Sequence, residues 1–227
     1  MAPTLLVAGG HGPLGAALRA ALANEGTLRT LDFPAAPHAD VHAAATIADA
    51  SIEGPIAAVI DLLGPHPLAA PSPRREAARA AALARAQALS GWVAARPRRP
   101  AVLVQLSSAL AYADHGDQSL DENAPVGGAP TADVFAAHVA ATAPAAAAGV
   151  RVVELRAGMV LGAGLGLHAA LSPLLSRRLR PRHLGRAVPW IDLEDLIAVL
   201  RAALHMPELS GPLHVASPGQ LDGKGLL

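Results

Sequence analysis

The sequence contains no cysteine, five aromatic residues and one lysine, and its 18 basic and 18 acidic side chains give a formal net charge of zero. The absence of cysteine excludes a disulfide framework and a thiolate nucleophile, and it is typical of a reducing, cytoplasmic location. Balanced charge and scarce aromatic residues argue against nucleic-acid binding, which relies on a positive field or on stacking platforms. Lys224 is the single candidate for lysine-dependent chemistry.

Long apolar runs are also scarce. Residues 157–176 carry no formal charge, but their glycines and Pro173 are typical of a strand end, a loop and a short helix, so we expect no membrane span. The first seven residues lack a basic segment, which argues against a secretory signal. A chain of 227 residues predicts a single domain, 1–227, in which residues of about 163–190 and 205–227 form a small substrate-side region.

Apolar runs bounded by glycine alternate with helical patterns along the whole chain. This alternation predicts an α/β fold with a doubly wound parallel sheet, covered by helices on both faces, and a small C-terminal cap. Thr131 or Asp133 is expected to cap one of the helices, and Pro144 to disturb it. The expected strands are 4–8, 27–31, 57–63, 101–106, 150–155 and 213–216, and the expected helices are 14–24, 72–90, 131–148 and 192–205.

A glycine-rich loop follows the first strand. Gly9, Gly12 and Gly15 are spaced three apart, and Pro13 and Leu14 begin the next helix. The first glycine permits a tight turn, the second lets the backbone approach a pyrophosphate, and the third lets helix and strand pack closely. The N-terminus of the helix would offer free N–H groups to the phosphates. An ordinary glycine-rich turn is the alternative.

Asp32 ends the second expected strand, 23 residues after Gly9. A carboxylate at this position can accept both hydroxyls of an adenosine ribose and repels a 2′-phosphate, which favours NAD over NADP. A carboxylate that caps a turn or a helix is the alternative. With the glycine loop, Asp32 predicts a Rossmann-type dinucleotide site.

The chain resembles the extended short-chain dehydrogenases, specifically an atypical branch of the NAD-dependent epimerase/dehydratase family. The resemblance spans about residues 4–216, and the motifs that carry it occur in family order: GGHGPLG at 9–15, TIAD at 46–49, AVIDLLG at 58–64, LSSALAY at 106–112, DENAP at 121–125, LRAGMVLG at 155–162 and WIDLED at 190–195. The resemblance implies that Gly9, Gly12 and Gly15 hold the pyrophosphate of the cofactor, that Asp32 holds the adenosine ribose and that Asp49 lies near the adenine. It also implies that Leu62, Leu63 and Gly64 line the cofactor. Ser108 would stand at the position of the catalytic serine. A serine that caps a turn is the alternative for Ser108.

The sequence departs from the family pattern at the expected helix 131–148. Where the resemblance implies a tyrosine and a lysine one helical turn apart, the chain has Phe135 and Val139, which can neither move a proton nor bind a ribose hydroxyl. His138 on the same helix and Tyr112, the single tyrosine, are the candidate replacements beside Ser108. His138 could instead face solvent or the helix packing surface, and Tyr112 could be structural. The ten histidines show no metal-binding spacing, so we expect no metal.

We therefore expect an NAD(P)-binding, epimerase/dehydratase-like oxidoreductase with a non-standard catalytic site, acting on a small molecule. The alternatives are a non-redox isomerase, cyclase or dehydratase of secondary metabolism, in which a dinucleotide is structural or not bound, or a non-catalytic dinucleotide-binding protein. The arginines of 177–186 would bind an anion or form a solvated face. The helices at 72–90 and 132–148 would pair two copies as a homodimer or pack in a monomer.

Overall fold

The structure, a computed structural model, describes residues 2–9, 12–31, 52, 54–64, 73–113, 115, 118–162 and 189–219, the side chains of 73–75 excepted. At its centre is a sheet of six strands, each parallel to its neighbours. In spatial order they are β2 (Thr27–Leu31), β1 (Thr4–Ala8), β3 (Ala58–Asp61), β4 (Val102–Ser108), β5 (Arg151–Ala157) and β8 (Gly211–Val215). The predicted parallel α/β sheet is confirmed.

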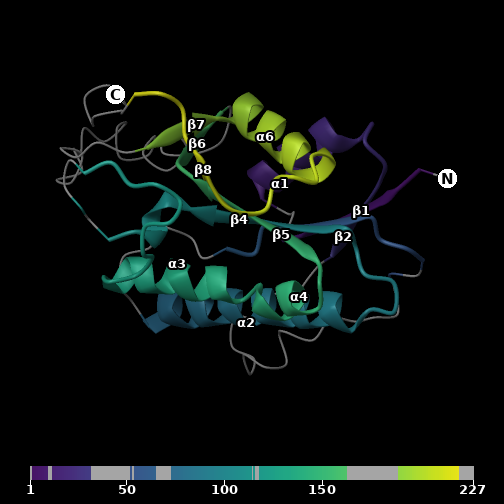
Figure 1. Ribbon diagram of the computed structural model, residues 1–227, viewed down its shortest axis with the longest axis horizontal. Helices are drawn as coiled ribbons and strands as arrows, with labels where there is room; N and C mark the ends of the chain where they lie inside the picture. The colour runs from purple at the N-terminus through teal and green to yellow at the C-terminus, as the bar shows by residue number, and fades with distance from the viewer. Residues whose placement is uncertain are drawn as a thin grey trace.

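Helices cover both faces of this sheet (Figure 1). On one face lie α1 (Pro13–Leu22) and α6 (Leu193–His205), and on the other α2 (Pro73–Ala95), α3 (Pro130–Ala140) and α4 (Ala143–Ala147). The chain passes from β1 to β2 on one side and then returns to β3 on the other side of β1. This reversal of direction is a topological switch point, and open α/β sheets generally bind ligands at the carboxyl ends of the strands at such a point.

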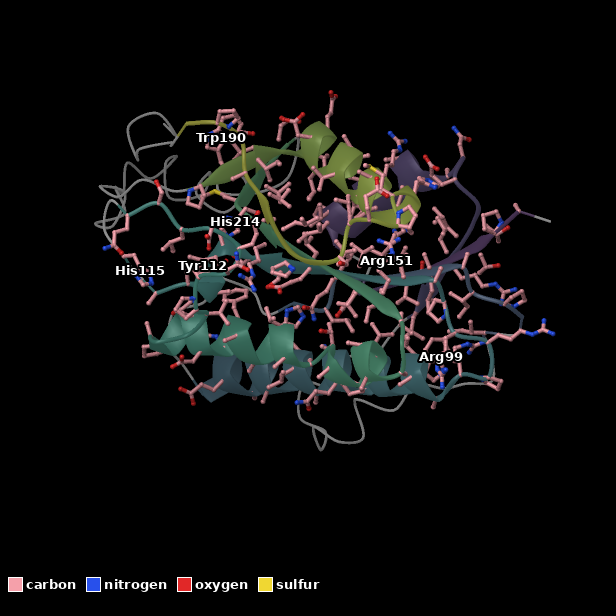
Figure 2. All side chains as sticks on the ribbon, viewed as in Figure 1. Arg99, Tyr112, His115, Arg151, Trp190 and His214 are labelled. Carbon is pink, nitrogen blue, oxygen red and sulfur yellow. The ribbon has the colours of Figure 1, made fainter. Side chains whose placement is uncertain are left out.

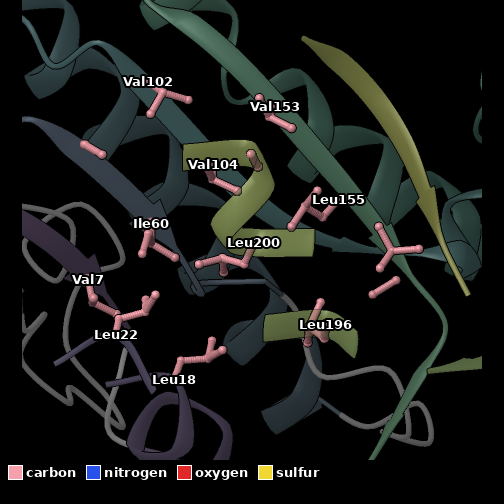
Figure 3. Packing of buried hydrophobic residues seen from close by; sticks show 14 of the residues in the cluster. Val7, Leu18, Leu22, Ile60, Val102, Val104, Val153, Leu155, Leu196 and Leu200 are labelled. Atoms are coloured by element: carbon pink, nitrogen blue, oxygen red, sulfur yellow. The ribbon is translucent and has the colours of Figure 1, made fainter. Parts of the chain in front are cut away.

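Two apolar clusters sandwich the sheet because successive strand residues point to opposite faces. In β4, Val102 and Val104 join the cluster beneath α1 and α6, whereas Leu103 joins the cluster on the opposite face. Figure 3 shows the first cluster, in which Leu18 of α1 and Leu200 of α6 pack against the valines and leucines of the central strands. Most residues of the first part of β4 and of β1 and β3 are apolar and buried on both faces, as expected of central parallel strands, and buried polar side chains occur at Asp61, Gln105 and Glu154.

Three local features differ from the expectations. The expected helix 131–148 divides into α3 and α4, with Pro144 in the first turn of α4, where a proline lacks no hydrogen bond. The start of α3 is Pro130 after Ala129, not a cap by Thr131 or Asp133, and the Asp133 carboxylate instead accepts a hydrogen bond of 2.8 Å from the Gly128 amide.

A two-stranded parallel sheet of β6 (Met159–Leu161) and β7 (Trp190–Asp192) was not anticipated. It forms where Gly158 approaches Pro189, since a Cβ on Gly158 would lie 2.6 Å from the Pro189 carbonyl carbon. Within 205–227, β8 pairs with β5 in the central sheet. Residues 163–188 lie outside the described residues, so the substrate-side region stays a prediction. Among the described helices, none combines the length and apolarity needed to cross a membrane.

Candidate dinucleotide and substrate site

The glycine loop joins the end of β1 to α1. Gly9 has a φ of +81°, and a Cβ there would lie 3.0 Å from both the carbonyl carbon and the oxygen of Leu62. A side chain is therefore excluded both by the left-handed backbone and by the close approach of β3. The loop thus meets the carboxyl end of β3 directly.

The loop changes character at Gly12, which begins α1. Gly12 and Pro13 are exposed, and a Cβ on Gly12 would meet no described atom within 4 Å. No described side chain caps the helix at Gly12, so the first N–H groups of α1 are available to a ligand. Gly15 is buried and Leu14 is half-buried, and the packing role of the third glycine stays a prediction.

Three residues after β3 complete this edge. The Leu62 amide donates to the Ala8 carbonyl at 2.9 Å, which continues the pairing of β1 and β3 beyond the strands. Leu62 and Leu63 contribute their side chains to the clusters on opposite faces, and Gly64 is exposed. The structure therefore brings Gly9, Gly12 and Gly64 together at the carboxyl ends of β1 and β3. Asp32 and Asp49 lie outside the described residues, as do Lys224 and the arginines of 177–186, and their roles stay predictions.

Ser108 is the last residue of β4. Its hydroxyl accepts a hydrogen bond of 3.2 Å from the Leu110 amide and so caps a short 3₁₀ helix, η3 (Ala109–Ala111). This contact is the turn cap that was the alternative to a catalytic role. The hydroxyl proton is not used in that bond, because the oxygen is the acceptor. A catalytic role for Ser108 stays a prediction.

Tyr112 is held by side chains of β5 and β8. Its hydroxyl accepts a hydrogen bond from Arg156 and lies 2.7 Å from Nε2 of His214, and the guanidinium of Arg156 lies 5.1 Å from the centre of the phenol ring. Figure 2 shows Tyr112 and His214 beside each other. Burial raises the pKa of Tyr112 although Arg156 acts to lower it, so the phenol is protonated at neutral pH. These contacts fasten the start of the loop that leads to α3.

Glu154 and Arg156, which sequence reasoning missed, hold this network together. Two hydrogen bonds of 2.7 and 3.1 Å join the guanidinium to the Glu154 carboxylate, and a third of 3.1 Å reaches the carbonyl of Glu122. The Glu122 carboxylate in turn accepts from the His214 amide at 3.0 Å. The signal was present in the sequence, because charges two residues apart in a buried strand lie on one face and must be paired.

His138 lies on the packing face of α3 and is fully buried. Its Nε2 is 3.9 Å from Oδ2 of Asp61, a residue of β3 that is itself buried. Gln105 of β4 lies between the two and donates to the His138 carbonyl at 2.9 Å and to Asp61 at 3.4 Å. Burial lowers the pKa of His138 and raises that of Asp61. Of its two anticipated positions, the histidine therefore takes the packing surface.

α3 has no proton donor at the two positions where the family resemblance implies a tyrosine and a lysine. Phe135 is buried and Val139 is half-buried. No group of three or more potential metal ligands occurs within the part of the chain that the structure describes. Ser108 and Tyr112 flank η3, and His138 is buried on α3, which packs against η3 and β4, so the catalytic roles of the three residues stay predictions.

Comparison with known families places this arrangement. The model of the NAD-dependent epimerase/dehydratase family matches residues 5–215. An epimerase family protein of Mycobacterium bovis is 36% identical over 121 residues, which cover 52% of this chain and 40% of that protein. A Mycobacterium leprae epimerase family protein is 36% identical over 110 residues, covering 47% of this chain and 36% of that protein. The match spans less than half the length of these curated relatives.

Solved structures share the fold. A nucleoside-diphosphate sugar epimerase from Corynebacterium glutamicum aligns with a TM-score of 0.80 at 23% identity, over all of this chain and 49% of its own. A human epimerase family protein with NADPH gives a TM-score of 0.75 at 24% identity, over 98% of this chain and 77% of its own. An enzyme of Bordetella bronchiseptica in complex with NAD and UDP gives 0.67 at 18% identity, over 97% and 74%.

Proposed function

The chain belongs to the NAD-dependent epimerase/dehydratase family, and on that premise we propose that it is a nicotinamide-dinucleotide-binding oxidoreductase with a non-standard catalytic site that acts on a small molecule. One observation carries the proposal. At Gly12 the exposed start of α1 has room beside its backbone and no described side chain on its first N–H groups. This is the arrangement that a pyrophosphate requires.

The residues present fit a dinucleotide. In this proposal Gly9, Gly12 and the first turn of α1 hold the pyrophosphate, Asp32 after β2 holds the adenosine ribose, and Gly64 gives the cofactor access to the end of β3. Because β2 and β3 flank β1 on opposite sides, a cofactor with its adenosine half at β2 extends its other half over β3 and β4. When bound, the nicotinamide would supply hydride transfer to or from a substrate carbon.

The roles of the chain's own side chains follow from their contacts. We place Ser108 nearest to the substrate, because it ends β4 and its hydroxyl proton is free to be donated to a substrate oxygen. Tyr112, bound to Arg156 and His214, holds the loop beside Ser108 rather than moving a proton itself. His138 acts from beneath the edge, since it is fully buried.

Calorimetric titration with NAD, NADH, NADP and NADPH tests the proposal. We expect binding, with the NAD forms preferred, and we expect Asp32→Ala to weaken binding of NAD. Gly12→Ala should reduce dinucleotide affinity at least tenfold, because the new methyl group fills the space beside the pyrophosphate, yet lower stability by only about 0.5 kcal/mol.

Gly91→Ala is the matched control, because Gly91 lies within α2 and a Cβ there would also meet no described atom within 4 Å. It should leave affinity unchanged. If no dinucleotide binds at millimolar concentration, the proposal is wrong. If Gly12→Ala binds as well as the parent protein, the loop is not the phosphate site.

A second function is favoured by α3, which presents buried Phe135 and half-buried Val139 where the family resemblance implies a proton donor and a lysine. In that alternative the protein binds a dinucleotide but performs a non-redox reaction or none. Absorbance of bound NADH, followed during incubation with a panel of aldehydes, ketones and sugar nucleotides, separates the two functions. Loss of the reduced nicotinamide supports the oxidoreductase, and persistence together with tight binding supports the alternative.

A further inference from the structure

A row of buried polar side chains crosses the sheet beneath α3. Asp61 of β3 is the register partner of Gln105 of β4, which is the partner of Glu154 of β5. All three are buried, on the face of the sheet that α2 and α4 cover with an apolar cluster. Buried polar groups in an apolar layer are costly unless they are paired, and here Gln105 Oε1 and both ring nitrogens of His138 have no hydrogen-bond partner among the described residues.

The row lies directly below the proposed cofactor site. A Cβ on the exposed Gly64 would be 3.4 Å from Cε1 of His138 and 3.3 Å from the carbonyl oxygen of Leu106. One glycine therefore separates the imidazole from the edge over which the nicotinamide half of a dinucleotide would extend. The absence of a side chain at Gly64 keeps that separation small.

Asp61 and His138 are poised to hold one proton between them. Burial raises the pKa of Asp61 and lowers that of His138, so the two titrations approach each other. The pair then has two states. In the first, a carboxylate and a neutral imidazole carry one net negative charge, and in the second, one added proton makes the pair uncharged overall. With 3.9 Å between Nε2 and Oδ2, the added proton is not locked into a short bond between the two groups.

The other charges around the imidazole do not take over this role. Glu154 also acts to raise the pKa of His138, but its carboxylate is bound by Arg156 through two hydrogen bonds. β4 contributes the uncharged Gln105 and Ser107. Among the side chains that the structure describes on α2 and α3, the remaining charged groups are Asp133, which binds the Gly128 amide, and Glu76, Arg79 and Arg85, and the pKa of His138 responds to Asp61 and Glu154 rather than to these four.

We propose that the Asp61–His138 pair gains a proton when the reduced dinucleotide binds and loses it when the oxidised dinucleotide binds, compensating for the charge on the nicotinamide ring. The proposal rests on the proposed function. The oxidised ring carries a positive charge that the reduced ring lacks, so an anionic pair beneath the ring favours the oxidised form and an uncharged pair favours the reduced form. With Val139 where the resemblance implies a lysine, this pair is the titratable unit closest to Gly64 among the described residues.

The dissociation constants of NAD and NADH, measured by calorimetry between about pH 5.5 and 8.5, test the inference. We expect the ratio of the NADH constant to the NAD constant to rise about tenfold across this range in the parent protein. Titrations in two buffers of different ionisation enthalpy should show proton uptake with NADH and proton release with NAD. His138→Gln and Asp61→Asn should each make the ratio independent of pH, whereas His115→Gln, an exposed histidine on the loop after Tyr112, should leave it unchanged.

The results of these titrations distinguish a failure of the Asp61–His138 proposal from a failure of the proposed dinucleotide-binding function. If neither form binds, the proposed function is wrong and the inference fails with it. If both bind but their ratio is independent of pH in the parent protein, or changes equally in His138→Gln, the inference alone is overturned. Should the variants not fold, histidine-labelled parent protein decides by nuclear magnetic resonance, because the inference requires one buried imidazole to differ in protonation between the NAD and NADH complexes.

Discussion

At Gly9 the backbone and its surroundings exclude a side chain for two separate reasons. The φ of +81° costs a residue with a Cβ about 1–2 kcal/mol. The backbone of Leu62, 3.0 Å from the position of that Cβ, cannot move without disturbing the pairing of β1 and β3. We expect Gly9→Ala to lower the free energy of unfolding by about 2–4 kcal/mol, as measured by urea denaturation.

Gly91→Ala is the comparison for that measurement. Gly91 lies within α2, and a Cβ there would meet no described atom within 4 Å, so this variant should be neutral or more stable by about 0.5–1 kcal/mol, because alanine restricts the unfolded chain. Equal stability of the two variants would mean that the β1–α1 loop relaxes around the new methyl group and that close packing on β3 does not select glycine.

Individual site residues were predictable to different degrees. Glycine spacing was enough to predict a tight turn at Gly9, because the reason for glycine there is local to the backbone, whereas the phosphate-binding role of Gly9 and Gly12 stays a prediction. The partners of Tyr112 could not be predicted in this way. Arg156 and His214 lie 44 and 102 residues away in sequence, and the order of the strands in the sheet brings them to Tyr112. The same holds for Asp61, which pattern reasoning treated as one residue of an apolar strand.

Among the elements, α6 has a defined cap at each end. At its start the Asp192 carboxylate accepts from the Glu194 amide at 2.8 Å. Arg151, labelled in Figure 2, is the first residue of β5. Its guanidinium donates to the carbonyls of Ala203 and Leu204, at the end of α6, at 3.0 and 3.5 Å, and to the carbonyl of Leu209 at 2.7 Å. One strand residue thus satisfies carbonyl groups that a helix terminus leaves without partners.

We expect Arg151→Met to lower the free energy of unfolding by about 1–2 kcal/mol, because methionine keeps the apolar stem but leaves those carbonyls without a donor. Arg201→Met is a useful contrast. Arg201 is more exposed and bonds Glu25 and the Ala21 carbonyl, so its loss should cost less, about 0–1 kcal/mol. Denaturation of both variants by urea measures the difference, and a larger loss from Arg201→Met would contradict the capping argument.

Elements were predictable where one periodicity governs a segment. The strands at 4–8 and 27–31 occur as expected: the first is a short apolar run that ends at a glycine, and the second is a short segment between Gly26 and Asp32. The expected helix 131–148 divides because Pro144 has no N–H group to donate within a continuous helix. A disturbance at Pro144 was predicted, but not the division into two helices. β6 and β7 were not found, because three-residue strands carry too short a pattern and depend on the approach of Gly158 to Pro189.

For the whole molecule, the strand order decides what can act together. Loops from β1 and β3 meet because these strands are neighbours, whereas they are about 50 residues apart in sequence. Ser108, which the family resemblance places at the position of the catalytic serine, and Tyr112 flank η3, and His138 lies buried on α3, the helix that packs against η3. Strand order thus places residues of β3, β4 and α3 beside one another at the carboxyl end of the sheet, and the catalytic roles of Ser108, Tyr112 and His138 stay predictions.

The buried pair also governs how stability depends on pH. Since burial holds the folded-state pKa of His138 below its ordinary 6.5, the unfolded chain binds that proton more tightly, and stability is full above about pH 6.5 and falls as the pH decreases through that value. Asp61 has the opposite effect, because its folded-state pKa lies above 3.8 and the stability it contributes at low pH is lost as the pH rises through the folded value. The two slopes therefore oppose each other.

Urea midpoints measured between about pH 5 and 7.5 separate the two contributions. His138→Gln should abolish the loss of stability below about pH 6.5. Asp61→Asn should make that loss steeper, up to about 1.4 kcal/mol per pH unit, because it removes both the opposing slope and the carboxylate that raises the pKa of the imidazole. Glu25 and Glu122, whose pKa values are held below 4.5, stay ionised throughout this range and cannot mimic the effect. An identical pH dependence in the parent protein and both variants would show that His138 and Asp61 do not change protonation on unfolding, and would place the origin of any acid sensitivity elsewhere.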